Sequence, residues 1–169
     1  MILLASDPDQ QFRAYFFGNN YISPIQHGIQ AAHVVTRFFV KYHNDDNITE
    51  SEVLYEWAEN HMTKILLNGG YQSNLAKIYK IFEKVGPIIG LPFTQFREEQ
   101  DSLNGALTSV GIVVPMGLLE TAASNIGRQQ LFEGASIDQL LGYLDNNRKL
   151  QKIDAILILA ATLKTGKLA

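Results

Sequence analysis

Two glutamines and a histidine share one side of a helix that the sequence predicts from Ser23 onward. Gln26, Gln30 and His33 are spaced four and then three residues apart, so their polar side chains follow one stripe of that helix. Amide and imidazole groups near a helix N-terminus could hold an anionic ligand, because the free N–H groups there attract negative charge. The alternative is an ordinary amphipathic helix with a solvated glutamine edge, and the spacing alone leaves both interpretations open.

The start of this helix has its own signals. Ser23 is a preferred N-cap residue, and Pro24 follows at the first helical position, where a missing N–H does no harm. We expect the helix to run to about Tyr42 and to bury one apolar stripe at helical spacing. That predicted stripe consists of Ile25, Ile29, Ala32 and Val35.

Strand and helix patterns alternate along the first two thirds of the chain. Helices are expected from Thr49 and over Ser73–Val85, where Gly86 and Pro87 are predicted to end the helix. The order therefore predicts an α/β fold, with a small mixed β-sheet and flanking helices. The predicted strands are Phe12–Phe17, Thr63–Leu67, Leu91–Phe96 and Thr108–Val114.

The composition limits the functions that the chain can have. The 169 residues are 46% hydrophobic, which is enough for one domain of ordinary size. There is no cysteine, so disulfides and thiolate chemistry are excluded. We see no signal peptide after Met1 and no apolar run long enough to span a bilayer, and we therefore expect a cytoplasmic protein. A net charge of −3 gives no support to broad electrostatic binding of nucleic acid.

Several motifs between Phe12 and Pro115 occur in the order and near the spacing of one known family. The sequence resembles the type II peptidyl-tRNA hydrolases, which cleave the ester between a peptide and the 3′ end of tRNA without a cofactor. The motifs that carry the resemblance are Gln30-Ala31-Ala32-His33, Trp57 before Thr63-Lys64-Ile65-Leu66-Leu67, Leu75 to Gly86, Gly90-Leu91-Pro92-Phe93 with Arg97, and Thr108 to Pro115.

The residues that matter for chemistry depart from the family pattern. The family has a lysine where this chain has Gln26, and a neutral amide can only form hydrogen bonds. The aspartate that follows the arginine in the family is Glu98 here, and its threonine is Ser102. The acidic stretch Glu99-Gln100-Asp101 replaces a turn with a basic residue and would repel tRNA. We therefore expect weak or no hydrolysis of peptidyl-tRNA.

If the chain packs as the resemblance implies, the predicted helix faces the loop from Arg97 to Ser102. His33 near Glu98 would then act as a general base with Ser102 as its hydroxyl partner. Gln26, His27, Gln30 and Arg97 would bind the ligand by hydrogen bonds. In the alternative interpretation His33 is an ordinary helix histidine and residues 98–101 form a solvated turn. No His, Asp or Glu group has the spacing of a structural metal site, and we expect neither a metal nor a cofactor.

Three classes of function remain open on the sequence alone. The first hypothesis is a binder, with little or no catalysis, of a nucleotide-derived small ligand, for example one that sequesters a signalling nucleotide. The second is a divergent hydrolase that acts on the tRNA 3′ end. The third is a structural or adaptor protein.

Residues 116–169 have no counterpart in the resembling family and are expected to form a helical extension of the α/β domain at 1–115. Helices are predicted over Gly117–Arg128, Ser136–Asp145 and Leu150–Lys164. The many apolar side chains of the last two must be buried against the core, a ligand or a second copy of the chain. We expect part of this surface to form a symmetric homodimer.

Overall fold

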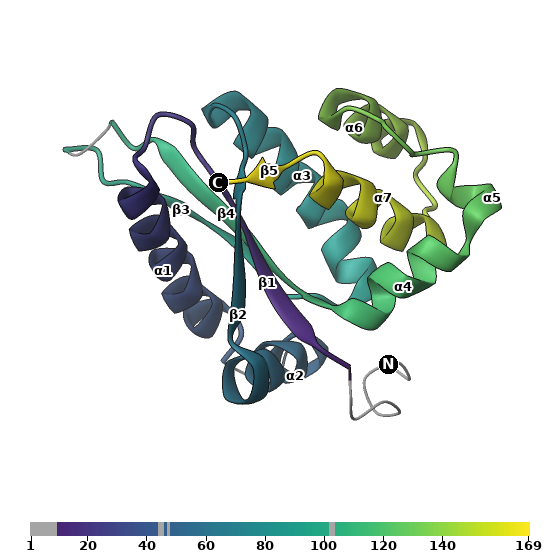
Figure 1. Cartoon of the computed structure of the whole chain (residues 1–169), viewed down its shortest axis with the longest axis horizontal. Helices are drawn as coiled ribbons and strands as arrows, with labels where there is room; N and C mark the ends of the chain where they lie inside the picture. Colours follow the sequence, from purple (N-terminus) through teal and green to yellow (C-terminus); the bar gives the residue numbers. More distant parts are fainter. Residues whose placement is uncertain (1–9, 44–45, 47, 102–103) are drawn as a thin grey trace.

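The protein is built around a five-stranded mixed β-sheet with the strand order β3-β4-β1-β2-β5 (Figure 1). The computed structural model describes the chain except residues 1–9, 44–45, 47 and 102–103. Strands β1 and β2 are parallel, and the other neighbouring pairs are antiparallel. This architecture confirms the predicted α/β class with a small mixed sheet. The strands are β1 (Phe12–Gly18), β2 (Thr63–Asn68), β3 (Phe93–Arg97), β4 (Leu107–Pro115) and β5 (Lys167–Leu168).

The two central strands are buried on both sides because helices cover both faces of the sheet. All nine residues of β4 are buried, and its sequence is accordingly apolar with no strict alternation. On β1, Phe16 contacts Phe38 of helix α1, whereas Phe17 contacts Phe82 of helix α3 on the opposite face. The aromatic residues of β1 thus contribute to the hydrophobic core on both faces of the sheet.

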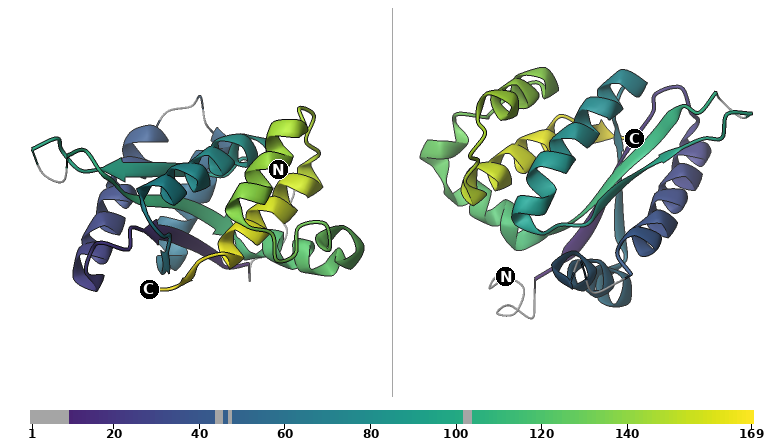
Figure 2. Two further views of the ribbon diagram at one scale, coloured as in Figure 1. Left: turned by 90° about the horizontal axis from the view of Figure 1, so that it is seen from above. Right: turned by 180° about the vertical axis from the view of Figure 1, so that it is seen from behind.

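Helix α1 packs on one face of the sheet and helix α3 packs on the other, with α7 against α3 on that side (Figure 2). A short π-helical turn, η2 (Trp57–His61), extends α2 and leads into β2. None of the described helices is long and apolar enough to cross a membrane. The helices are α1 (Pro24–Lys41), α2 (Ile48–Glu56), α3 (Gln72–Ile89), α4 (Met116–Ser124), α5 (Ile126–Gln129), α6 (Ile137–Asn146) and α7 (Lys152–Lys164).

The predicted start of α1 is confirmed, but its predicted buried stripe is wrong. The Ser23 hydroxyl accepts a hydrogen bond from the Gln26 backbone N–H, and the Gln26 side-chain oxygen accepts one from the Ser23 backbone N–H, which forms a capping box. Ile25 is 79% exposed and Ile29 is 50% exposed. The helix is turned so that a neighbouring stripe faces the sheet, where Val34 lies over Gly111. The buried residues of α1 are His27, Gln30, Ala31, Val34 and Phe38.

The predicted end of α3 is also wrong. The helix continues through Pro87 to Ile89 and ends at Gly90, which has a left-handed φ of 85°. Gly86 serves packing instead, because a Cβ there would come within 2.6 Å of the Phe93 ring. Ile89 is 3% exposed, so burying the last turn offsets the proline's missing N–H.

The C-terminal region covers the α3 side of the sheet. Ser136 caps α6 with Gln139 in a second capping box, as the sequence predicts. The predicted helix Gly117–Arg128 is divided at Asn125 into α4 and α5, and the two-residue strand β5 is not predicted.

Helices α6 and α7 bury their apolar residues within the chain, mostly against α3. Ile156 and Leu159 are 3% and 0% exposed. Asp154, which interrupts the apolar run of α7, is buried and receives two hydrogen bonds from the Arg128 guanidinium at 2.9 and 3.0 Å. Burial inside the chain accounts for this apolar surface, and the homodimer stays a prediction.

Candidate functional site

The candidate site lies where the first half of α1 crosses the ends of β1 and β4. The side chains of His27 and Gln30 point from α1 toward the sheet, and they are 4% and 6% exposed. Polar side chains in such a position are uncommon unless they are hydrogen-bonded or serve a ligand. The turned helix therefore places inside the protein two residues that the sequence predicts as ligand-binding.

Gln30 connects two strands through its amide group. Its nitrogen donates a hydrogen bond to Glu98 Oε1 at 2.6 Å, and its oxygen accepts one from Thr108 Oγ1 at 2.8 Å. Gln30, and not the predicted His33, is thus the α1 residue that hydrogen-bonds to Glu98. The second oxygen of Glu98 has no partner among the described residues and can accept a hydrogen bond from a ligand.

His27 is buried without a hydrogen bond to either ring nitrogen from the described residues. Its ring occupies the space above Gly18, where any Cβ would overlap it. Gly18 pairs with Ser109 of β4, whose buried hydroxyl likewise has no partner among the described residues. Burial lowers the pKa of His27 below its ordinary value of 6.5, so the ring is neutral at pH 7.

His33 lies on the exposed side of the same helix and forms a stacked pair with Phe96 of β3. The ring centroids are 4.4 Å apart with an interplanar angle of 23°, and the Arg37 guanidinium lies 5.9 Å from the Phe96 centroid. His33 and Glu98 do not hydrogen-bond to each other in the described part of the chain. The arrangement gives an exposed planar surface beside a carboxylate rather than a histidine oriented by it.

The other predicted site residues have separate roles. Gln26 is used in the capping box of α1, and the Arg97 guanidinium donates a 3.5 Å hydrogen bond to the Gly105 carbonyl. Ser102 lies outside the described residues, so its predicted role as a hydroxyl partner stays a prediction. No three His, Asp or Glu side chains gather as metal ligands in the part of the chain that the structure describes.

Sequence reasoning missed Thr108, Ser109 and Gly18. One signal was present, because Thr108 and Ser109 are two polar residues at the start of an otherwise apolar central strand. Their burial shows that the polar atoms at this end of β4 face α1 rather than solvent.

The unpartnered His27 ring makes stability depend on pH. We expect the free energy of unfolding to fall as the pH drops below about 6.5, because the unfolded chain takes up a proton that the buried ring excludes. The stabilising contribution is complete above that pH and is lost as the pH falls through the lowered pKa of the folded state. Urea unfolding at about pH 7.5 and 5.5 measures the change.

His27→Gln should flatten this pH dependence, whereas His43→Gln, which alters an exposed histidine after α1, should leave it unchanged. A His27→Gln variant with the same pH dependence as the unmodified protein would contradict the expectation.

The comparison of the sequence with known families and curated proteins found no relative. No protein-family model matches the chain, and no curated protein matches it. The resemblance to type II peptidyl-tRNA hydrolases therefore depends on the motifs in the sequence alone.

Proposed function

We propose that the site between α1 and the β3–β4 hairpin binds a nucleotide-derived small ligand and returns it unchanged. The observation that carries the proposal is the Glu98 oxygen that no described residue bonds, two positions after the Phe96 ring on which the exposed His33 stacks. A carboxylate oxygen accepts hydrogen bonds from the N–H groups of a nucleobase, and a planar ring pair offers a face on which a base can stack.

Cationic side chains near the stack suit the phosphate of such a ligand. The Arg37 guanidinium lies over the Phe96 ring, and Arg97 follows Phe96 directly in β3. Arg97 makes only a long contact with the Gly105 carbonyl, so its guanidinium retains donors for a phosphate. Base, sugar and phosphate would then be recognised by three different types of group.

The same contacts favour binding over hydrolysis of a peptide–tRNA ester. Gln26, at the position of the family's lysine, is a neutral residue committed to the helix cap. Glu98 is bonded to Gln30 rather than to His33, so it does not orient an imidazole as a general base. Divergent peptidyl-tRNA hydrolysis is the alternative that the experiment must exclude.

A thermal-shift screen against ribonucleoside mono-, di- and triphosphates and cyclic nucleotides tests the proposal, with calorimetry for each hit. We expect at least one nucleotide to raise the melting temperature, because a ligand that binds only the folded state stabilises it by mass action. Chromatography of the recovered ligand should show no conversion, and peptidyl-tRNA should remain intact.

Two neighbouring glutamates provide a matched pair of variants. Glu98→Gln keeps the shape and the bond to Gln30 but removes the charge, and we expect it to weaken the binding of the nucleotide at least tenfold. Glu99→Gln makes the same change at an exposed neighbour and should alter affinity less than twofold. Equal effects of the two variants, turnover of peptidyl-tRNA, or no response to any nucleotide would overturn the proposal.

A further inference from the structure

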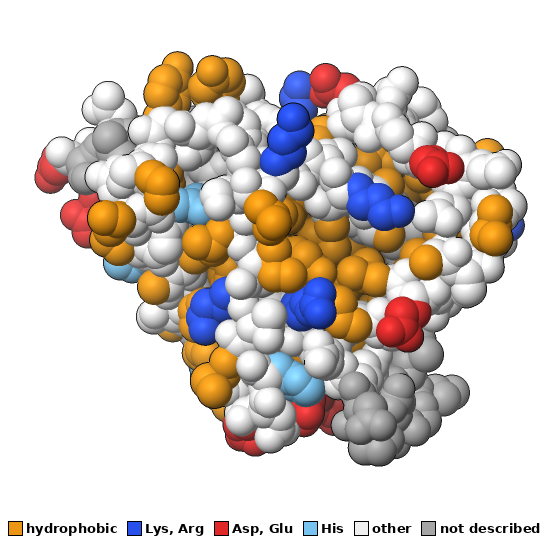
Figure 3. Space-filling view, in the orientation of Figure 1, with side chains coloured by type: hydrophobic (Ala, Val, Ile, Leu, Met, Phe, Trp, Pro, Cys, Tyr) orange, Lys and Arg blue, Asp and Glu red, His pale blue; other side chains and the backbone are white. Residues whose placement is uncertain are grey.

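A groove with an apolar floor lies on the other face of the sheet, between β1 and the helices α4 and α7. Figure 3 shows it as a hollowed apolar area in the centre of the molecule. Its middle part has a volume of about 240 Å³ and adjoins hollows of about 190 and 550 Å³, with which it shares lining residues. The middle part is lined by Tyr15, Leu119, Ala122, Ala123, Leu163 and Lys164, among others.

Two donors at one end of this groove lack a good acceptor. The Tyr15 side chain is 8% exposed, and among the described residues its hydroxyl donates only to the Met116 sulfur at 3.8 Å, which is a weak acceptor, while the neighbouring Arg13 side chain interacts with the Tyr15 oxygen. The Arg13 Nε atom is buried and has no hydrogen-bond partner among the described residues. Arg13 and Tyr15 are on the same face of β1, two residues apart, and the hollows they line share Leu119 and Ala123.

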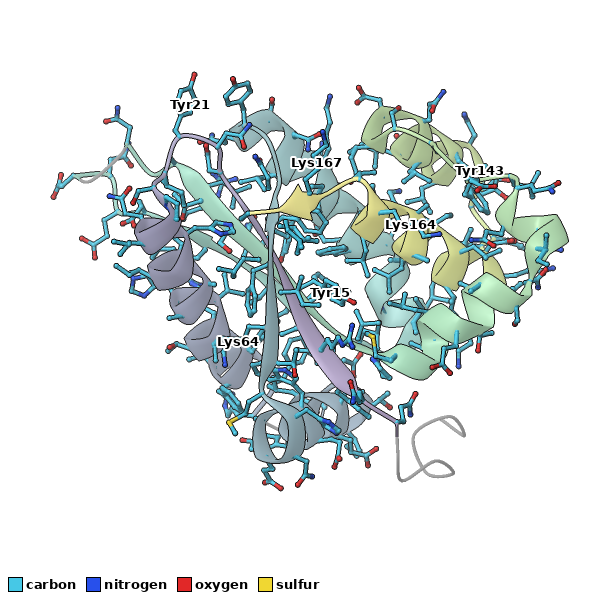
Figure 4. The ribbon with its side chains drawn as sticks, viewed as in Figure 1. Tyr15, Tyr21, Lys64, Tyr143, Lys164 and Lys167 are labelled. Atoms are coloured by element: carbon cyan, nitrogen blue, oxygen red, sulfur yellow. The ribbon has the colours of Figure 1, made fainter. Side chains whose placement is uncertain are left out.

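The charges around the groove complement an anion. Glu120 borders the Arg13 hollow but forms no ion pair with Arg13 within the described part of the chain. Lys164, whose side chain comes from α7, makes neither an ion pair nor a hydrogen bond with a described residue. Figure 4 shows Tyr15 pointing from β1 into the space in front of α7 and Lys164. An acidic protein thus presents, at this apolar surface, two cations that form no ion pair with the residues that the structure describes.

We infer that the groove binds an amphiphilic carboxylate, a molecule with an apolar chain and one carboxylate head group. The head group accepts a hydrogen bond from the Tyr15 hydroxyl and pairs with the Arg13 guanidinium, so that the hydroxyl gains a stronger acceptor and the cation gains a counter-charge. The chain lies along Leu119, Ala123 and Leu163, where burial of its methylene groups supplies the affinity. The connected hollows reach the size of ordinary small-molecule sites.

Binding of decanoate to the 169-residue chain tests the inference, with decyltrimethylammonium as the probe of opposite charge. Decanoate should displace the fluorescent anion anilinonaphthalene sulfonate from the groove, and calorimetry should give its affinity directly. We expect decyltrimethylammonium to bind at least tenfold more weakly. Equal binding of the two probes, or no binding of decanoate, would overturn the inference.

Four substitutions locate the head group. Arg13→Gln should raise the decanoate Kd at least tenfold, and Tyr15→Phe should raise it about fivefold by removing one hydrogen bond. Lys164→Gln should change it less than threefold, and Arg148→Gln, outside the groove, should leave it unchanged. A larger effect from Lys164→Gln than from Arg13→Gln would show that the assigned head-group site is wrong.

A variant that fills the groove tests decanoate binding without changing the polar groups of the head-group site. Ala123 is exposed and lines both connected hollows, so Ala123→Trp should fill the groove without disturbing the core. We expect it to abolish decanoate binding while the melting temperature stays within a few degrees. Unchanged decanoate binding to a folded Ala123→Trp protein would place the ligand elsewhere and overturn the inference.

Discussion

Ile156→Asp should unfold the protein at room temperature or bring it close to unfolding. Ile156 is 3% exposed in α7, among buried residues of that helix. The substitution removes the burial of one isoleucine, worth about 1.5–3 kcal/mol, and adds an unpaired buried charge. The total loss of about 4–5 kcal/mol is comparable with the whole stability of a small domain. Urea unfolding followed by circular dichroism measures it.

Ile126→Asp is the matched control because it makes the same change at a 67% exposed position in the same region. Its free energy of unfolding should stay within about 0.5 kcal/mol of the unmodified protein. If Ile156→Asp instead left one transition intact and removed only a second, smaller one, residues 116–169 would be a separable extension. A single weakened transition would show that α7 belongs to the core.

Gly18→Ala should abolish nucleotide binding at the proposed site while leaving the protein folded. Any Cβ at Gly18 overlaps the His27 ring, so the imidazole must leave its buried position above β1. Overpacking of this kind costs about 1–3 kcal/mol. Because His27 precedes Gln30 by one helical turn, its displacement also disturbs the bonds of Gln30 to Glu98 and Thr108. Calorimetry with the nucleotide found in the screen measures the loss.

Gly28→Ala provides the contrast, since it adds the same methyl group next to His27 but into open space. An alanine inside a helix is favoured over glycine, so this variant should gain about 0.5–1 kcal/mol of stability and keep its affinity. Opposite changes in stability from the two alanines would support the observed position of His27. Full affinity in Gly18→Ala would contradict the proposed role of this end of the sheet.

The element order and the fold class could be predicted because each strand and helix carries its own local signal. The alternating aromatic and apolar runs and the two serine caps act within a few residues, whereas the end of α3 at Gly90, beyond the predicted stop at Gly86 and Pro87, depends on the burial of the last helical turn. The rotation of α1 about its axis could not be predicted in this way. Apolar residues recur at helical spacing on two of its sides, and only contact with Gly111 and Phe16 of the sheet decides which side is buried.

The site was predictable in its residue types but not in its geometry. Gln30 and Glu98, 68 positions apart in the sequence, form a hydrogen bond, whereas the prediction placed His33 beside Glu98. The choice of hydrogen-bond partner for each polar side chain depends on distances of a few tenths of an ångström. The spacing of residues in the sequence does not give these distances. His33 therefore stacks on Phe96 while His27, nearly two helical turns earlier, lies buried beside Gly18.

The position of β1 in the middle of the sheet has a consequence for protein synthesis. Its neighbour β4 follows far along the chain, and Phe12 pairs with Pro115. At roughly 5–20 residues per second, a ribosome needs several seconds to pass from Gly18 to the end of β4. During that interval the aromatic strand has left the exit tunnel without its antiparallel partner, and it is then a substrate for chaperones and for aggregation with other nascent chains.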